Sequence, residues 1–498
     1  MRIVDTSEMR AAEAAASARG VPGFQLMRRA GCAAAELISS WARRFGFSRL
    51  VFLCGGGNNG GDALVAAALL ADDFQCVLYL SRPLTHLRGE AKEAAAMLPR
   101  KLAASAVADF DALELHGGDL LIDGLLGIGL QGEVRAPLSE IIRKINESHL
   151  PVIALDVPSG MDSDSGRGCI PGGTALYASC TITFGLPKRG LFTPDGMAFS
   201  GSLHIADIGL SDESESQPVV AYSDSEALRD LPRFDVDTHK NRRGQLLIMA
   251  GSRRYPGAAA LAALAGLRGG AGLVRLMCPE GANTVLPHAA IPVTLPATGQ
   301  GGFAAVPDWN EYPGADTLVA GPGWGDDVPP EVLQKVLDFP GRLLLDADAL
   351  NLLARHPELW RRRGETVITP HPGEAERLRC AFGIPATNDR ADLARRLAER
   401  TGTVVVLKGP RTAVAAEGLG VSLNISGSAD LATAGSGDVL SGLIGALLAN
   451  GLNAYPAARL GVFIHGRAGE ACGRGVISDD LPAAIGAVMQ KLEKGRFF

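Results

Sequence analysis

The sequence of 498 residues repeats one local pattern, in which a short apolar segment is followed by a turn rich in glycine and polar residues and then by an Ala- or Leu-rich segment. Short apolar runs bounded by such turns predict buried strands, and the longer Ala-rich segments predict helices. Because strands that alternate with helices pair in parallel, the pattern predicts an α/β fold with helices on both faces of each sheet. Strands are expected at residues 50–54, 74–80, 120–126, 152–157, 181–184, 245–249, 273–278, 317–320, 343–345, 367–369 and 404–407.

The chain is longer than a single hydrophobic core usually covers, so we expect two domains. An acidic and polar segment at residues 211–217 predicts a linker, which places the domains at residues 1–215 and 225–498. Residues 5–46 are expected to form two helices, because Asp5 and Glu8 have the spacing of a capping box and Pro22 follows Gly20. These helices are expected to cover a sheet edge or to favour a homo-oligomer.

Composition narrows the class of protein. A net charge of −6 argues against a nucleic-acid-binding chain. The eight cysteines are dispersed without a CxxC pair, so neither a zinc cluster nor a disulfide framework is predicted. No segment reaches the roughly 20 apolar residues of a membrane span, and the N-terminal residues lack the apolar core of an export signal. We therefore expect a cytoplasmic protein with no membrane or nucleic-acid partner.

A glycine-rich turn at Gly435, Ser436 and Gly437 precedes an apolar run long enough for a helix. Backbone N–H groups in such a turn can bind a phosphate group at the helix N-terminus. Asp438 follows directly, where a carboxylate would repel a phosphate unless it handles a proton or faces a substrate hydroxyl. The alternative is an ordinary glycine turn in which Asp438 caps the helix.

The first predicted strand is followed by a second glycine-rich turn, Gly55-Gly56-Gly57-Asn58-Asn59-Gly60-Gly61-Asp62, and then by a helix expected from Ala63. This order is typical of dinucleotide-type phosphate sites. The acidic ribose ligand expected after the next strand is missing, since Ser81 and Arg82 stand there. Arg82 could accommodate a 2′-phosphate, although an exposed loop arginine is the simpler interpretation.

Polar residues also follow the next strands of the first half. Asp123 precedes a glycine-rich loop at residues 124–132, and Asp156 begins the turn Asp-Val-Pro-Ser-Gly. In a parallel sheet these strand ends meet at one edge, where their oxygens could bind a monovalent cation and a ligand. Taken singly, each Asp could instead be a helix cap or turn former. Lys188, after the strand at 181–184, could neutralise a phosphate or donate a proton, or be a solvated lysine.

Together these motifs resemble a known family. The first half resembles the YjeF N-terminal domain through residues 57–62, Asp123, the 156–160 turn, Phe184 and Lys188. The second half resembles ribokinase-like enzymes through residues 369–374 and 435–438. The combination is similar to the bifunctional NAD(P)H-hydrate repair family. It implies two three-layer α/β/α domains, a Rossmann-like epimerase of R and S NAD(P)H hydrate and a ribokinase-like dehydratase of the S form that uses ADP in bacteria.

The resemblance implies roles for individual residues. In the first domain the hydrate would be held by Asn58, Asn59, Gly60, Gly61, Asp62, Gly127, Ile128, Gly129, Leu130, Gln131, Gly132 and Glu133, with Asp156 at its reacting end. A potassium ion would be coordinated by Asn59, Asp123 and Ser159. In the second domain the hydrate would contact Ala258, Gly323 and His371, and ADP with a magnesium ion would contact Lys408, Gly409, Pro410, Arg411, Thr412 and Gly437. Asp438 would be the base of dehydration, and Asp156 with Lys188 would move protons in epimerisation.

Two positions depart from the family pattern, since Ala63 stands where glycine is usual and Ser436 where threonine is usual. Both replacements are small, so the loops are expected to be preserved. The alternative function is a ribokinase-like kinase of a vitamin or sugar hydroxyl, with an N-terminal domain that only binds. A stable phosphorylated product would favour that alternative.

Overall fold

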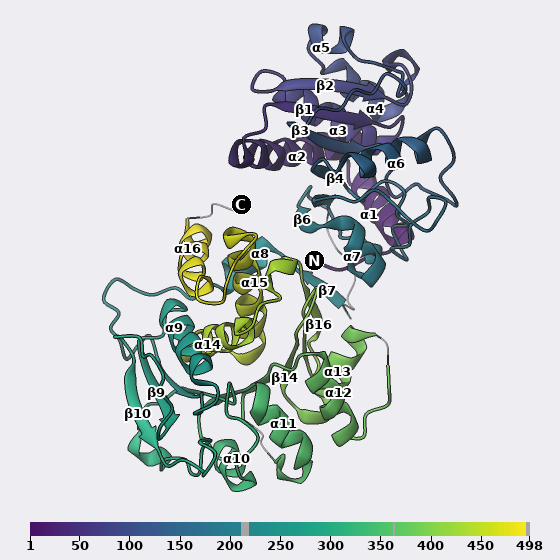
Figure 1. Ribbon diagram of the computed structural model, residues 1–498. Coiled ribbons are helices and arrows are strands. Elements are labelled where there is room, and N and C mark those ends of the chain that lie inside the picture. Colours follow the sequence, from purple (N-terminus) through teal and green to yellow (C-terminus); the bar gives the residue numbers. More distant parts are fainter. Residues whose placement is uncertain (211–218, 362–363, 388, 495–498) are drawn as a thin grey trace. The chain divides into compact units, whose positions relative to one another are not determined.

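The computed structural model describes residues 1–494 apart from 211–218, 362–363 and 388 (Figure 1). The described residues form two compact units, one up to Leu210 and the other from Val219. The predicted linker at 211–217 lies outside the described residues. The second unit includes a strand at Val219–Tyr222, which precedes the start expected at residue 225.

The first unit contains a six-stranded sheet in the order β2-β1-β3-β4-β5-β6, and every pairing is parallel. The carboxyl ends of all these strands therefore lie at one edge. The strands are β1 (Arg49–Cys54), β2 (Gln75–Leu80), β3 (Asp119–Gly124), β4 (Val152–Leu155), β5 (Cys180–Phe184) and β6 (Ser202–Ala206). Strand β6 is not among the strands expected from the sequence.

Helices cover both faces of this sheet. Leu50 and Phe52 pack into a core with α2 and α3, whereas Val51 and Leu53 pack into a separate core with α6 on the other face. The elements are α1 (Thr6–Ala18), α2 (Gly23–Phe45), α3 (Asn58–Leu70), η1 (Leu84–His86), α4 (Gly89–Ala96), α5 (Arg100–Ala104), α6 (Leu138–Ser148), η2 (Arg189–Phe192) and α7 (Pro194–Ser200). The unit is thus a three-layer α/β/α domain.

The two expected N-terminal helices are present, and α1 begins with the predicted capping box of Asp5 and Glu8. Helix α2 packs on α3 and so covers a sheet face rather than an edge. Helix α3 begins at Asn58, five residues before the expected Ala63. The first turn of α3 requires glycine at position 60, because a Cβ on Gly60 would lie 2.0 Å from the carbonyl oxygen of Gly55.

The second unit contains a ten-stranded sheet in the order β10-β9-β8-β11-β12-β13-β14-β15-β16-β7. Only the pairings of β15 with β14 and with β16 are antiparallel. The strands are β7 (Val219–Tyr222), β8 (Gln245–Met249), β9 (Leu273–Pro279), β10 (Ile291–Leu295), β11 (Thr317–Ala320), β12 (Arg342–Leu345), β13 (Thr366–Ile368), β14 (Val404–Leu407), β15 (Ala413–Ala416) and β16 (Gly420–Asn424). Four of these strands are not among those expected from the sequence, namely β7, β10, β15 and β16.

Helices again lie on both faces, and Figure 1 shows α15 and α13 on opposite sides of β14 and β16. The elements are α8 (Asp224–Asp230), α9 (Pro256–Arg268), η3 (Trp309–Glu311), α10 (Pro330–Leu337), α11 (Ala347–Arg355), η4 (Pro357–Leu359), α12 (Pro372–Ala381), α13 (Arg390–Thr401), η5 (Ala429–Leu431), α14 (Ser436–Ala449), α15 (Ala454–Cys472) and α16 (Leu481–Glu493). Helices α9 and α14 pack closely because Gly442 faces the backbone of α9, where a Cβ would lie 2.0 Å from an oxygen. The predicted α/β fold class is confirmed.

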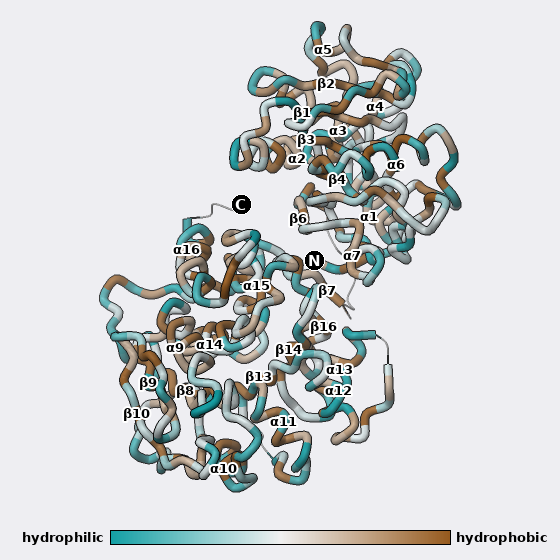
Figure 2. The backbone as a smooth tube through the Cα atoms, in the orientation of Figure 1, coloured by the Kyte–Doolittle hydropathy of each residue, from teal (hydrophilic) through white to brown (hydrophobic). Residues whose placement is uncertain are grey.

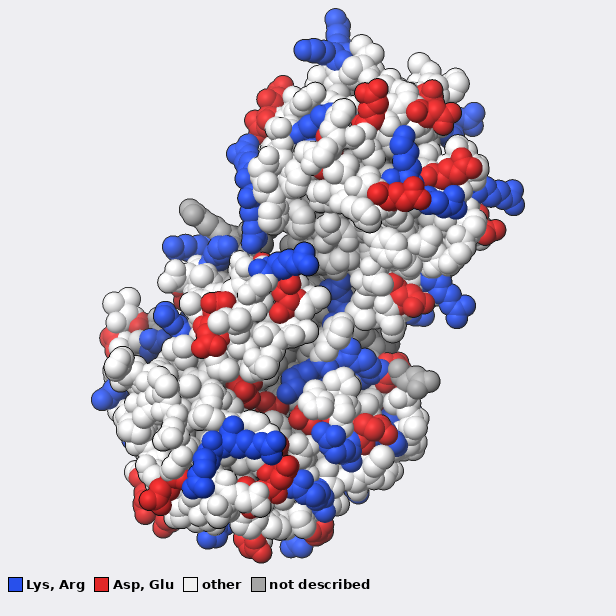
Figure 3. Space-filling view, in the orientation of Figure 1, with Lys and Arg blue, Asp and Glu red and all other residues white. Residues whose placement is uncertain are grey.

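Hydropathy varies along the chain in both units, and charges of both signs lie on their surfaces. In Figure 2 the hydrophobic colour is strong in strands such as β9, whereas the region of α12 and α13 is largely hydrophilic. On the face shown in Figure 3, basic and acidic side chains are interspersed over each unit. Within the described ranges, none of the helices combines the length and apolar character that crossing a membrane requires.

Candidate active sites

A cavity of about 950 Å³ opens at the carboxyl edge of the first sheet, beside the ends of β1, β3 and β4. The predicted residues that line it are Asn58, Asn59, Gly60, Asp62, Gly127, Ile128, Gly129, Leu130, Gln131 and Asp156. Gly61 is buried against Met27, and Gly132 and Glu133 continue the loop beyond the lining residues. The structure thus brings most of the predicted residues of this site together around one space.

Asn59, Asp123 and Ser159 form one buried hydrogen-bond network. Ser159 donates from its hydroxyl to Asp123 Oδ1 at 2.6 Å and from its backbone N–H to Oδ2 at 2.8 Å. Asn59 donates through Nδ2 to the carbonyl oxygens of Leu126 and Leu155, at 2.8 and 2.9 Å. Asn59 Oδ1 is buried and has no hydrogen-bond partner among the described residues. Burial raises the pKa of Asp123 to about 6, against the hydrogen bonds from Ser159 and Leu125.

Lys188 is completely buried and forms an ion pair with Asp156. Its ammonium group also donates to the carbonyl oxygen of Phe184 at 2.8 Å and to Thr183 Oγ1 at 3.3 Å. The interpretation of Lys188 as a solvated lysine is therefore wrong. Asp156 adopts a left-handed conformation with φ of 63°, which is uncommon for a residue other than glycine and is often found at functional sites.

Two further carboxyl groups face this ion pair. Burial, and after it the negative charge of Asp156, raises the pKa of Asp62 well above its usual range. Burial and the charge of Asp156 also raise the pKa of Glu13, which reaches the cavity from α1. The sequence analysis missed Glu13, because it lies in a helix that has no motif of its own. The buried ion pair of Lys188 and Asp156 therefore lies next to carboxyl groups that hold protons readily.

In the second unit, Asp438 lies in the first turn of α14, at the carboxyl edge of the second sheet. Gly435 has a φ of 87° and starts this helix, so the predicted glycine turn continues directly into the helix from Ser436. No side chain of a described residue caps this end. The N–H of Ser436 donates to the carbonyl oxygen of Thr433 at 3.3 Å, and the N–H groups of Gly437 and Asp438 are open to an anion. The Ser436 hydroxyl lies 3.2 Å from Nε2 of the buried His465.

Asp438 shares its surroundings with an ion pair of Lys408 and Asp346. Lys408 Nζ lies 2.7 Å from Asp346 Oδ1, and Ser441 of α14 donates to Asp346 Oδ2 at 2.8 Å. A Cβ on Gly437 would lie 3.4 Å from Lys408 Nζ, which places the ammonium group beside the first turn of α14. Burial, and then the charge of Asp346, raises the pKa of Asp438 to about 7, whereas Lys408 lowers it.

Glu374 joins the same cluster from α12. Its Oε2 lies 4.0 Å from Lys408 Nζ, and its Oε1 lies 3.2 Å from His371 Nε2. Burial raises the pKa of Glu374 to about 7, against the effect of Lys408. His371 caps α12, since its Nδ1 accepts from the N–H groups of Gly373 and Glu374. Glu374 and Asp346 also follow predicted strands, but only His371 was assigned a role from the sequence.

Arg390 of α13 stabilises the loop from Lys408 to Thr412. The Arg390 guanidinium donates to the carbonyl oxygens of Leu407, Lys408 and Pro410. Arg411 donates to the carbonyl oxygen of Ile425 at 2.8 Å, within its own unit. These bonds fix the backbone of a loop that borders the cluster around Asp438.

Ala258 and Gly323 lie side by side, since a Cβ on Gly323 would be 2.8 Å from the Cβ of Ala258. The neighbouring Gly325 donates its N–H to Asp348 at 2.9 Å, and the charge of Asp348 also raises the pKa of Asp438. The segment after β11 thus reaches the environment of Asp438.

Each unit therefore places acidic and basic side chains at the carboxyl edge of a largely parallel sheet, which defines a two-domain α/β protein with one candidate active site in each domain. Residues 23–190 match the family model of the YjeF-related protein N-terminus, and residues 246–490 match that of NAD(P)H-hydrate dehydratase.

Relatives match along nearly the whole chain. The bifunctional NAD(P)H-hydrate repair enzyme Nnr of Coxiella burnetii is 37% identical over 95% of this chain and 96% of its own length. The enzyme of the same name from Escherichia coli is 35% identical over 94% and 90%, respectively. The crystal structure of the ADP/ATP-dependent NAD(P)H-hydrate dehydratase of Bacillus subtilis, co-crystallized with ATP and Mg²⁺, is 28% identical, covers 56% of this chain and all of its own, and has a TM-score of 0.46. The chain belongs to the family of bifunctional NAD(P)H-hydrate repair enzymes.

Proposed function

We propose that the first unit interconverts R and S NAD(P)H hydrate and that the second unit dehydrates the S form while ADP is converted to AMP and phosphate. The observation that carries this proposal is Asp438, a carboxyl group with a pKa of about 7 at an open helix N-terminus beside Lys408. A base with this pKa is matched to a neutral reaction, and the helix N-terminus and the ammonium group suit a phosphate. Membership of the family supports the assignment of the substrates.

The dehydration follows from the need to remove a poor leaving group. Asp438 takes the proton of the C6 hydroxyl. The oxygen of that hydroxyl attacks the β-phosphorus of ADP, and AMP leaves. Phosphate then leaves the resulting ester as the C6–O bond breaks, because the ring nitrogen donates its electron pair. Loss of a proton from C5 restores the dihydropyridine. Lys408 and the N–H groups of α14 would stabilise the charge on the transferring phosphoryl group. Asp346 would hold Lys408 in place.

In the first unit we assign the proton transfers of epimerisation to Asp156 and Lys188. During epimerisation the hydroxyl-bearing C6 must pass through a planar or ring-opened species. A side chain therefore has to accept a proton in one half of the reaction, and a side chain has to donate a proton in the other half. The ion pair lies beside the cavity and is oriented by Phe184 and Thr183. Asn58, Asp62 and the loop from Gly127 would hold the hydrate.

A potassium ion fits the residues beneath the first cavity. Asn59 Oδ1 is a buried oxygen without a partner, and Asp123 is a buried carboxylate whose described hydrogen bonds come from neutral donors. Such oxygens suit a hard cation. We propose that Asn59, Asp123 and Ser159 hold it and that its charge orients the neighbouring loop. The described residues contain no cluster of three His, Cys, Asp or Glu side chains that could hold a metal ion. We propose that magnesium arrives with the phosphates of ADP.

The eight cysteines of the chain carry free thiols, which suits a reducing compartment. We propose that the protein acts in the cytoplasm on free small molecules, without nucleic acid or membrane, and as a homo-oligomer. Light scattering after size exclusion tests the last point, since a mass near the 51.8 kDa of one chain would refute it.

Two nearly isosteric variants test the division of labour. Asp438→Asn is expected to abolish most ADP-dependent recovery of NADH from the S hydrate and to leave interconversion of the epimers unchanged. Asp156→Asn is expected to do the reverse. Epimers separated by chromatography, together with AMP and phosphate, give both rates in one sample. If either variant lost both reactions, or neither, while remaining folded, the assignment of one reaction to each unit would be wrong.

A further inference from the structure

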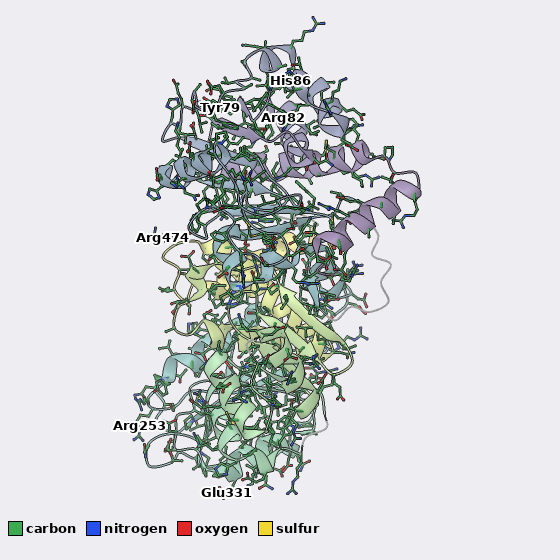
Figure 4. All side chains as sticks on the ribbon, turned by 90° about the vertical axis from the view of Figure 1, so that its right-hand side faces the viewer. Tyr79, Arg82, His86, Arg253, Glu331 and Arg474 are labelled. Carbon is green, nitrogen blue, oxygen red and sulfur yellow. The ribbon has the colours of Figure 1, made fainter. Side chains whose placement is uncertain are left out.

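We propose that Arg82 recognises the 2′-phosphate of NADPH hydrate and gives the first unit a preference for this substrate over NADH hydrate. The inference rests on the proposed epimerase function of that unit. It concerns a residue that follows β2, the strand beside β1 in the sheet, and that lines the cavity described above. Figure 4 labels Arg82 together with Tyr79 of β2 and His86 of η1.

The position of Arg82 follows from the sheet. The N–H of Ser81 donates to the carbonyl oxygen of Cys54 at 2.9 Å, so the segment after β2 is tied to the end of β1. The Arg82 side chain extends over the glycine-rich turn, because a Cβ on Gly56 would lie 2.3 Å from Arg82 Nε and 2.8 Å from Cζ. The guanidinium thus lies directly beside Gly56.

Arg82 offers a positive charge at the place where dinucleotide-binding sheets bind the ribose. In dinucleotide-binding sheets the diphosphate lies at the helix after the first strand, and the ribose extends to the end of the neighbouring strand. An acidic residue at that place accepts from a free 2′-hydroxyl, whereas an arginine accommodates a 2′-phosphate. Here Ser81 and Arg82 are both exposed and neither is acidic. Within the described ranges no carboxylate forms an ion pair with Arg82, so its charge stays available for a ligand.

A guanidinium suits a phosphate monoester better than a hydroxyl, since it donates two parallel charge-assisted hydrogen bonds. The shared chemistry of a phosphate could instead place Arg82 on the diphosphate, which both hydrates contain. The two possibilities differ in one measurable respect. Loss of a contact to the 2′-phosphate lowers activity with NADPH hydrate alone, whereas loss of a contact to the diphosphate lowers activity with both.

The test compares the full chain with Arg82→Gln, Arg82→Lys and Arg100→Gln, where Arg100 is an exposed residue of α5 outside the cavity lining. Epimer interconversion is measured for both hydrates at low substrate. Arg82→Gln is expected to lower kcat/KM for NADPH hydrate about tenfold or more and to leave the value for NADH hydrate within about twofold. Arg82→Lys should keep part of the preference, and Arg100→Gln should change neither value.

Equal losses with both hydrates, or no change in their ratio, would overturn the inference. Equilibrium binding of NADP⁺ and NAD⁺ gives a readout that does not need turnover, and any binding to the second unit is common to wild type and Arg82→Gln. Weaker binding of NADP⁺, with unchanged binding of NAD⁺, by Arg82→Gln would support the inference. Failure of the wild type to interconvert the epimers would refute the epimerase function itself and would leave this binding result unaffected. Identical NADP⁺ binding by wild type and Arg82→Gln would refute the role of Arg82.

Discussion

The rate of dehydration is expected to rise with pH through neutrality, because Asp438 must be deprotonated to act as the base. Its pKa is raised to about 7 by burial and by Asp346. A group with that pKa is about 9% deprotonated at pH 6 and about 91% at pH 8, so kcat/KM for the S hydrate should increase about tenfold between these values. The sign follows from the raised pKa, since the active form accumulates only above it.

Asp438→Asn should lower the rate of dehydration by a factor of about 10² to 10⁴, which is the usual contribution of a general base. The variant should also lose the rise of the rate with pH. Asp346→Asn should move the rise to lower pH, because it removes a negative charge that raises the pKa of Asp438. Asp338→Asn, at an exposed helix end, is the matched control.

The assay follows reduced-nicotinamide absorbance from purified S hydrate with saturating ADP at pH 6 to 8. Full activity of Asp438→Asn would refute its role as the base. A profile of Asp346→Asn that coincides with the wild type would refute the electrostatic part of the reasoning.

Three further predictions concern stability. Lys188→Met leaves Asp156 without its buried partner and should cost the first unit about 3 kcal/mol, seen as an earlier urea transition of that unit; an unchanged transition would contradict the burial of this pair. Gly442→Ala places a Cβ 2.0 Å from the backbone of α9 and should destabilise the second unit by at least about 2 kcal/mol, whereas Gly257→Ala, with open space around it, should not. Burial lowers the pKa of His465 from 6.5 to about 4, so the fold keeps it neutral and stability should fall by up to about 3 kcal/mol as the pH decreases from 6.5 towards 4. His465→Gln should weaken this pH dependence of stability. Equal acid sensitivity of the wild type and His465→Gln would contradict the contribution of His465.

Much of the fold was predictable from local pattern. Short apolar strands bounded by turns lead to Asp123 and Asp156 in the first sheet and to Lys408 in the second, so the position of each residue at the carboxyl edge of its own sheet follows from the sequence. The antiparallel β15 and β16 were missed because they are short and separated by a three-residue turn without a strong apolar run. The start of α3 was placed too late, because glycines are unfavourable in helices and only tertiary contacts favour them here.

The sites were predictable as sets of residues but not as contacts. The pairing of Lys408 with Asp346 joins residues 62 positions apart, and no local pattern specifies which carboxylate the lysine meets. The contribution of Glu13 depends on where α1 packs. The burial of Lys188 was likewise invisible, since a lysine in a loop is usually solvated.

The most direct test of the account uses the purified full chain with mixed R and S NADH hydrate, potassium, magnesium and ADP. Recovery of reduced-nicotinamide absorbance is followed to completion, and AMP and phosphate are quantified. We predict that both epimers are converted to NADH faster than they interconvert without enzyme, with one AMP and one phosphate for each NADH formed. Recovery of the S portion alone would contradict the epimerase assignment, and a stable phosphorylated product would contradict the dehydratase assignment.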